Sequence, residues 1–126
     1  MAFTIEEIPD SDALLHHVPH QMWVAAEERP SSACFKKKPS LSVNWIRYSS
    51  VTHTRREKSF AVISLLAGGC RNIGQEVQHS PIEADEPFGP NQAHTDILGE
   101  KPQPVADQLA RLARVEWIKA KIIRAI

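Results

Sequence analysis

The chain has 126 residues, of which 42% are hydrophobic and 24% are charged, and these proportions are typical of one globular domain of ordinary size. It has no apolar run of about 18 residues and no basic, apolar leader, so neither a membrane-spanning helix nor a signal peptide is predicted. Its two cysteines are too few for a disulfide framework. We therefore expect a single domain over residues 1–126, located in the cytoplasm.

The formal charge sums to zero but is segregated along the chain. Residues 1–28 carry six acids and no Lys or Arg, and residues 72–107 carry seven acids against one base. Residues 29–71, called the basic block below, carry nine Lys and Arg against one acid, and residues 108–126 carry five bases against one acid. Such blocks indicate electrostatic recognition, either of an anionic partner or between the blocks within the fold.

The first residues, 1–11, are expected to be a poorly ordered lead-in, because Pro9 breaks any helix there. Asp12 has the side chain of a helix N-cap, and the pattern after it predicts a short helix that ends near Pro19. Further on, the alternation over residues 41–48 predicts a strand. It places Leu41, Val43 and Trp45 on one face, and Ser42, Asn44 and Ile46 on the other.

The almost continuous apolar run at 60–66 predicts a central strand covered on both faces, followed by a turn at Gly68 and Gly69. Further strands are predicted at 75–80 and 93–98, joined by an acidic, proline-bearing loop at 81–92. The expected fold is α+β: a mostly antiparallel sheet of about four or five strands, packed by a C-terminal helix and the short N-terminal helix.

The C-terminal helix is expected to begin at Pro104, a residue favoured in the first turn. Its apolar residues lie at helical spacing in two sets. The first set is Val105, Leu109 and Leu112, and the second is Val115, Ile118, Ile122 and Ile126. Two interpretations of the second set stay open: it forms a homodimer interface, or the helix curves around the protein's own core.

The basic block is the first candidate site. Its expected anion-binding residues are Arg29, Ser31, Ser32, Lys36, Lys37, Lys38, Arg47, Arg55 and Arg56. Because Phe35, Trp45, Tyr48 and Phe60 lie between them, the pattern favours a nucleotide, a nucleic acid or an acidic protein surface as the partner. The alternative is a solvated loop face or neutralisation within the fold. A pI near 7 argues against a dedicated duplex DNA binder.

The second candidate site consists of His79, His94 and Asp96. His94 and Asp96 point to the same face of an extended strand, and pairing with the preceding strand brings His79 to the same end of the sheet. A carboxylate beside a histidine is typical of general-base catalysis. No metal or cofactor is expected, since Pro19 spoils the zinc-binding spacing of His16 and His20. The sequence thus favours a non-catalytic binding module, with a small enzyme acting on a phosphate-containing substrate as the alternative.

Overall fold

The structure is a computed structural model that describes residues 2–84 and 89–119. Six strands form one sheet in the order β6-β7-β4-β1-β5-β8, and every pairing in it is antiparallel. These strands are β1 Ala13–Pro19, β4 Ser40–Trp45, β5 Ser59–Leu66, β6 Glu76–His79, β7 His94–Leu98 and β8 Arg114–Ile118. A separate ribbon joins β2 Trp23–Val24 to β3 Arg29–Pro30. The antiparallel α+β fold is confirmed, with six strands in its large sheet.

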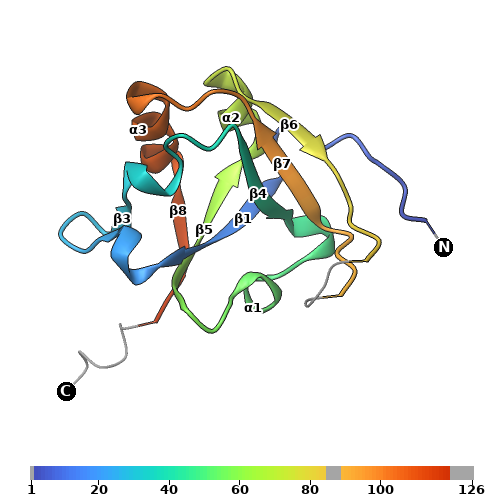
Figure 1. The fold of residues 1–126 in the computed structure, drawn as a ribbon, viewed down its shortest axis with the longest axis horizontal. Helices are drawn as coiled ribbons and strands as arrows, with labels where there is room; N and C mark the ends of the chain where they lie inside the picture. Colours follow the sequence, from blue (N-terminus) through green and yellow to red (C-terminus); the bar gives the residue numbers. More distant parts are fainter. Residues whose placement is uncertain (1, 85–88, 120–126) are drawn as a thin grey trace.

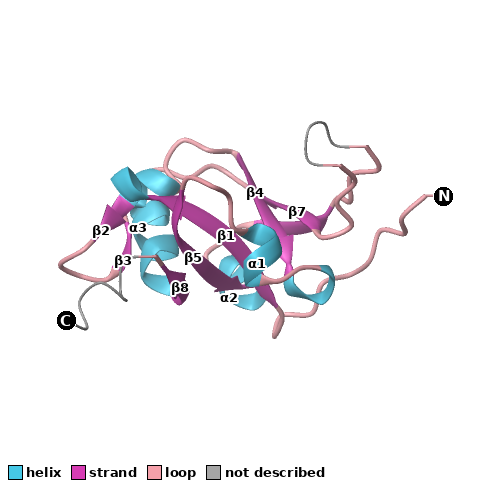
Figure 2. Cartoon of the chain, turned by 90° about the horizontal axis from the view of Figure 1, so that it is seen from below, coloured by secondary structure: helices cyan, strands magenta, loops and turns pink. Residues whose placement is uncertain are grey.

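The helices cover the two sides of the sheet unequally (Figures 1 and 2). Helices α2 Ala67–Asn72 and α3 Gln103–Leu112 lie on one side, and the single-turn α1 Val51–Thr54 lies on the other. Three 3-10 turns, His20–Met22, Ser32–Cys34 and Ile46–Tyr48, complete the described elements. The main core therefore forms beneath α2 and α3, whereas the α1 side is only partly covered.

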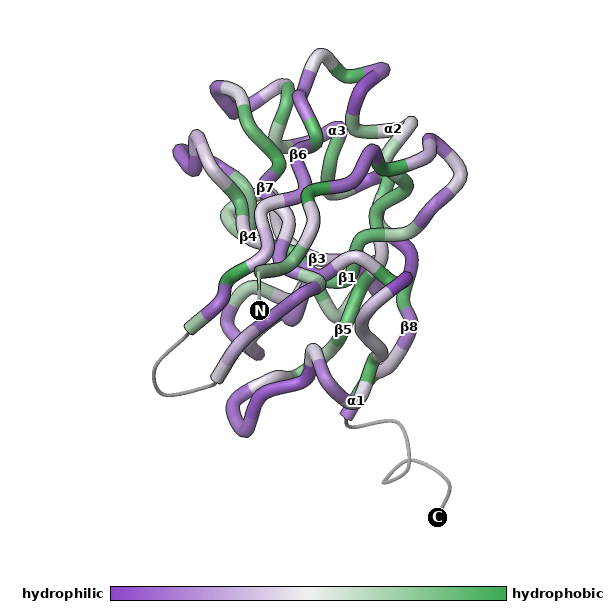
Figure 3. The backbone as a smooth tube through the Cα atoms, turned by 90° about the vertical axis from the view of Figure 1, so that its right-hand side faces the viewer, coloured by the Kyte–Doolittle hydropathy of each residue, from purple (hydrophilic) through white to green (hydrophobic). Residues whose placement is uncertain are grey.

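Strand β5 is the best-predicted element. It lies inside the sheet between β1 and β8, and Val62, Ile63 and Leu65 are completely buried. Figure 3 shows hydrophobic residues concentrated along β5 and hydrophilic residues in the outer loops. The buried side chains of α3 (Ala106, Leu109 and Ala110) belong to the same hydrophobic cluster as Ile63 and Leu65. Burial on both faces explains why β5 has no polar alternation.

The short N-terminal helix is a wrong prediction, because residues 13–19 form strand β1 instead. Leu14 pairs with Leu65 of β5 on one side and with Trp45 of β4 on the other, so tertiary pairing overrides the local helical signal. Asp12 caps no helix. Its Oδ2 accepts a hydrogen bond of 2.9 Å from Trp45 Nε1.

The expected lead-in has no helix or strand, yet it contacts the domain. Ile8 is buried in the hydrophobic core, and the backbone N–H of Glu6 donates to His79 Nδ1 at 3.0 Å. The expected turn at Gly68 and Gly69 is wrong, because both glycines lie in α2. A Cβ on Gly69 would approach Leu112 to 2.7 Å, so a glycine allows α2 to pack closely against α3.

The C-terminal helix is shorter than predicted. It ends at Leu112, and the next residues form the edge strand β8, in which Val115 pairs with Ile63 and Ile118 pairs with Ala61 of β5. Ile118 packs against the core and Val115 is 44% exposed, so these two residues form no helical stripe. Ile122 and Ile126 lie outside the described residues, as does most of the acidic stretch of loop 81–92.

Candidate functional site

The N-terminal acidic segment neutralises a third of the basic block. Each of three arginines from this block pairs with a carboxylate from residues 1–28. Arg29 Nε lies 2.8 Å from Glu27, Arg47 Nε lies 3.5 Å from Glu6, and Arg71 Nη1 lies 2.6 Å from Asp10. Part of the charge segregation therefore reflects contacts inside the fold.

Other predicted binding residues have structural partners. Ser31 accepts a hydrogen bond from the backbone N–H of Ala33 and so caps a 3-10 turn, and Ser32 accepts one from Gln103. The Arg55 guanidinium lies 4.6 Å from the centre of the Trp117 ring, a cation–π contact. These residues do not converge on one anion site.

The aromatic residues expected to stack on a ligand within the basic block are part of the hydrophobic core or pack against it. Phe35 and Trp45 are buried, and Tyr48 and Phe60 pack against the core. The exposed Lys36 and Lys37 therefore have no aromatic platform from this set beside them. Single-stranded nucleic acid is bound by basic grooves with stacking rings, and these four rings do not supply such a combination for Lys36 and Lys37.

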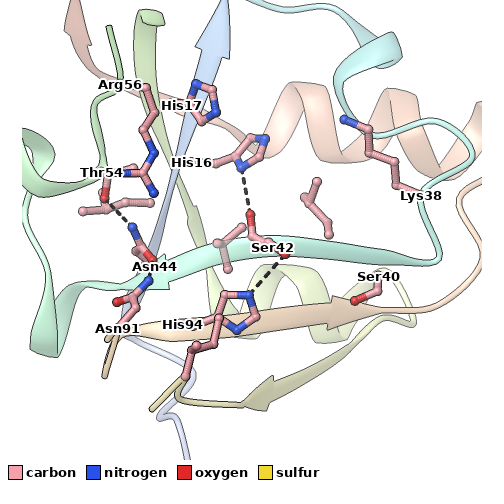
Figure 4. A pocket seen from close by; sticks show the side chains of 14 residues that line it. His16, His17, Lys38, Ser40, Ser42, Asn44, Thr54, Arg56, Asn91 and His94 are labelled. Carbon is pink, nitrogen blue, oxygen red and sulfur yellow. Dashed lines mark hydrogen bonds between the residues drawn. The ribbon is translucent and has the colours of Figure 1, made fainter. Parts of the chain in front are cut away.

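Two cations of the basic block, Lys38 and Arg56, reach a cleft on the α1 side of the sheet (Figure 4). The cleft has a volume of about 520 Å³. It opens because β1 and β4 pair only at Leu14 and Leu15 and then diverge. Its polar lining comes from β1, from β4 and the loop before it, from α1 and the segment after it, and from the start of β7 and the segment before it. The lining residues are His16, His17, Lys38, Ser40, Ser42, Asn44, Thr54, Arg56, Asn91 and His94.

His16 bridges the opening between the two strands. Its Nδ1 lies 3.0 Å from the backbone oxygen of Ser42, and since a carbonyl only accepts, Nδ1 is the donor. Burial, then neighbouring His17 and Lys38, lower the pKa of His16 to about 4. His16 is thus neutral at pH 7, and the proton on Nδ1 leaves Nε2 as the acceptor.

His17 lies beside His16 in the lining of the cleft, with the two ring centroids 5.7 Å apart (Figure 4). Burial, followed by the charges of Arg56 and Lys38, lowers its pKa. The Ser59 hydroxyl accepts from the backbone N–H of Arg56 at 2.8 Å and lies 3.1 Å from His17 Nδ1. The lowered pKa shows that Lys38 and Arg56 act electrostatically on the same space.

The floor of the cleft is a hydrogen-bonded row across β4 and β7. Asn91 Nδ2 donates to Asn44 Oδ1 at 2.9 Å, and Asn44 Nδ2 donates to Thr54 Oγ1 at 3.1 Å. Asn44 pairs with His94 in the sheet, and Ser42 pairs with Asp96, so these four side chains share one face. This row connects Asn44 of β4 to Thr54 of α1 and to Asn91 in the segment before β7.

The predicted catalytic group is divided between the two faces of the sheet. His94 and Asp96 lie at the cleft side, with His94 Nε2 4.0 Å from Asp96 Oδ1. His79 pairs with Thr95, so it points to the core side, where it is buried against Trp45 and Tyr48. Its Nδ1 accepts from Glu6 N–H, and its Nε2 lies 2.7 Å from the Gln92 carbonyl. Both nitrogens have structural partners, and the structure does not bring His79 to His94.

The sequence interpretation gave no site role to Ser42, Asn44, His16 or His17. A signal was present for Ser42 and Asn44, because a strand with a polar face beside fully apolar strands marks a sheet face that is not fully covered. For His16 and His17 the signal was hidden by the wrong helix.

Comparison of the chain with protein-family models, with characterised proteins and with solved structures found no match. The residues described here contain no helix long and apolar enough to cross a membrane. Over the same residues, no group of three or more His, Cys, Asp and Glu side chains is placed to hold a metal ion. The site must therefore be interpreted from its own geometry.

Proposed function

We propose that the protein binds a small phosphorylated molecule in the cleft between β1 and β4. The observation that carries this proposal is the convergence of Lys38 and Arg56 on a cavity of about 520 Å³. Ligand pockets of about 300–1,000 Å³ accommodate molecules of nucleotide size. A phosphate suits two cations flanked by hydrogen-bond donors, because it accepts charge-assisted bonds from several directions.

Several features favour an anion over a neutral ligand. No ion pair to Lys38 occurs within residues 2–84 and 89–119, and both Lys38 and Arg56 are half-buried. Burial is the main cause of the lowered pKa values of His16 and His17, and the nearby positive charges of Lys38 and, for His17, Arg56 lower them further. A bound phosphate would relieve this repulsion.

A small ligand is favoured over a nucleic acid. The positive groups at the cleft come from two loop positions rather than from a continuous basic groove, and Arg29, Arg47 and Arg71 are paired within the fold. The site lies within one chain and needs no second copy, since the helix expected to form a dimer ends at Leu112. Cys34 and Cys70 are buried thiols without a disulfide, which suits the reducing cytoplasm that we propose as the compartment.

Calorimetry with ADP, ribose 5-phosphate and a short single-stranded oligonucleotide tests the proposal, and the chain supplies two matched controls. Lys38→Gln is compared with Lys36→Gln, an exposed lysine in the same run. Arg56→Gln is compared with Arg55→Gln, whose guanidinium stacks on Trp117 instead. Losing one charged hydrogen bond costs about 1.5–3 kcal/mol, so each cleft variant should bind about ten- to a hundredfold more weakly than its control.

The outcomes separate the two kinds of anion binding. Binding of ADP or ribose 5-phosphate that depends on Lys38 and Arg56 but not on Lys36 and Arg55 supports the cleft. Oligonucleotide binding that weakens equally in all four variants would show a diffuse basic surface and refute the proposal. Failure of every probe to bind would also refute it.

A further inference from the structure

The Ser42 hydroxyl lies at the floor of the cleft with a histidine beside it (Figure 4). Ser42 is solvent-exposed, and its Oγ lies 3.2 Å from His94 Nε2. His94 is largely sheltered, with 17% of its side chain exposed. A hydroxyl within hydrogen-bond reach of an imidazole is the first requirement of an activated serine nucleophile.

The other nitrogen of His94 fixes the position of the ring proton. His94 Nδ1 lies 2.9 Å from the backbone oxygen of Ser80. That oxygen can only accept, so Nδ1 carries the proton and Nε2 presents its lone pair to Ser42. The Ser80 hydroxyl lies 3.2 Å from His94 Nδ1 and donates a hydrogen bond to Asp96 Oδ2 at 2.7 Å. Its proton is therefore used by Asp96, and it does not donate to His94 Nδ1.

Asp96 is placed to stabilise the protonated form of His94. Its Oδ1 lies 4.0 Å from His94 Nε2, the nitrogen that would receive the Ser42 proton. The carboxylate is held in place by two serine hydroxyls, from Ser80 at 2.7 Å and from Ser40 at 3.0 Å. Asp96 thus acts as a positioning and electrostatic residue without contacting the substrate.

A second serine–histidine contact shows what is specific to the cleft. Ser49 Oγ lies 2.7 Å from His53 Nδ1 on the exposed turn at α1. Within the described part of the chain, no hydrogen bond to a carbonyl fixes the ring proton of His53, and neither residue lines the cleft. Contact alone therefore does not distinguish Ser42. The fixed tautomer of His94, the nearby carboxylate and the cavity distinguish it.

We propose that Ser42 is the nucleophile and His94 the general base of a phosphoryl-transfer reaction on the ligand of the proposed function. Ser42 Oγ attacks phosphorus, its proton moves to His94 Nε2, the Oγ–P bond forms and the bond from phosphorus to the leaving oxygen breaks. His94 then gives the proton to that oxygen. Water next attacks the phosphoserine with His94 as base, which releases phosphate and restores the Ser42 hydroxyl. The reaction is a hydrolysis and needs no oxidant or reductant.

Covalent labelling tests the nucleophile without requiring anion binding. The intact protein is treated with diisopropyl fluorophosphate, a neutral reagent that transfers a phosphoryl group to activated serines with loss of fluoride, and the labelled residue is located by peptide mass mapping. We expect a single label on Ser42. Ser42→Ala should abolish it, His94→Gln should slow it by about a hundredfold or more, and the matched control Ser49→Ala should label at the rate of the unmodified protein.

Hydrolysis of 4-nitrophenyl phosphate tests the reaction class. It should be lost in Ser42→Ala, whereas thermal stability should persist because the removed hydroxyl is exposed. No label on Ser42, or equal labelling of Ser42 and Ser49, would overturn the inference, even where ADP binding upholds the proposed function. Hydrolysis of 4-nitrophenyl acetate but not of the phosphate would overturn the phosphoryl assignment.

Discussion

Protonation of His16 should couple folding stability to pH. In the folded protein, burial lowers the pKa of His16 from 6.5 to about 4, so the unfolded chain binds this proton first. Stability is therefore fully present above pH 6.5 and is lost as the pH falls from 6.5 to about 4. The free energy of unfolding falls by about 1.4 kcal/mol for each pH unit between these values, a total of about 3 kcal/mol. This is an upper figure, because His16 lines an open cleft.

His16→Asn isolates this contribution. The Asn amide retains an N–H that can donate to the Ser42 carbonyl, but it does not titrate. Urea unfolding is followed by the fluorescence of buried Trp45 at pH 7 and pH 5. Between these pH values the unmodified protein should lose about 2 kcal/mol more stability than His16→Asn does. His20→Asn, at an exposed position outside the cleft, is the matched control for replacing a histidine by asparagine.

Because pH also acts on stability through other groups, the informative quantity is the difference between the two proteins. Equal losses of stability in the unmodified protein and in His16→Asn would refute the reasoning. That result would mean that His16 is charged or solvated in the folded state.

Three further predictions concern buried side chains. Ile63→Ala should destabilise the protein by about 2–5 kcal/mol in urea unfolding, whereas Leu66→Ala, at a side chain that is 40% exposed, should cost far less. Cys34 and Cys70 should react with a disulfide reagent only on unfolding, since both are buried and burial raises the pKa of each thiol to about 11. Lys101→Met should cost about 2–3 kcal/mol, because the buried ammonium donates to two backbone carbonyls, and a small thermal shift would contradict that role.

The strands with a clear hydrophobic period were predictable, and those that depend on neighbours were not. The apolar run of β5 and the alternation of β4 identify both strands in isolation. Strand β1 contains two adjacent histidines and gains its stability from β4 and β5 on either side. In β8, residues Val115 and Ile118 fit a helical spacing, yet pairing with β5 determines the outcome.

The candidate site was predictable as far as local geometry reaches. His94 and Asp96 share a face because they are two residues apart on one strand. Placing His79 required the register of β6 against β7, and a change of one residue moves a side chain to the opposite face. In the observed register His79 lies opposite Thr95, so its side chain points into the core. Similarly, no local pattern separates Lys38 from Lys36, since the path of the loop decides which lysine reaches the cleft.

The divergence of β1 from β4 accounts for the position of the cleft and for the state of its groups. Where two strands separate, backbone groups lose their ladder partners and must be satisfied otherwise. The Ser42 carbonyl accepts a hydrogen bond from His16 Nδ1, and this bond holds an imidazole across the opening. On the other side of Ser42, β4 remains paired to β7, which keeps the hydroxyl facing His94. Ser42 is thus fixed by the sheet on one side and open to a ligand on the other, an arrangement that a fully paired sheet could not provide.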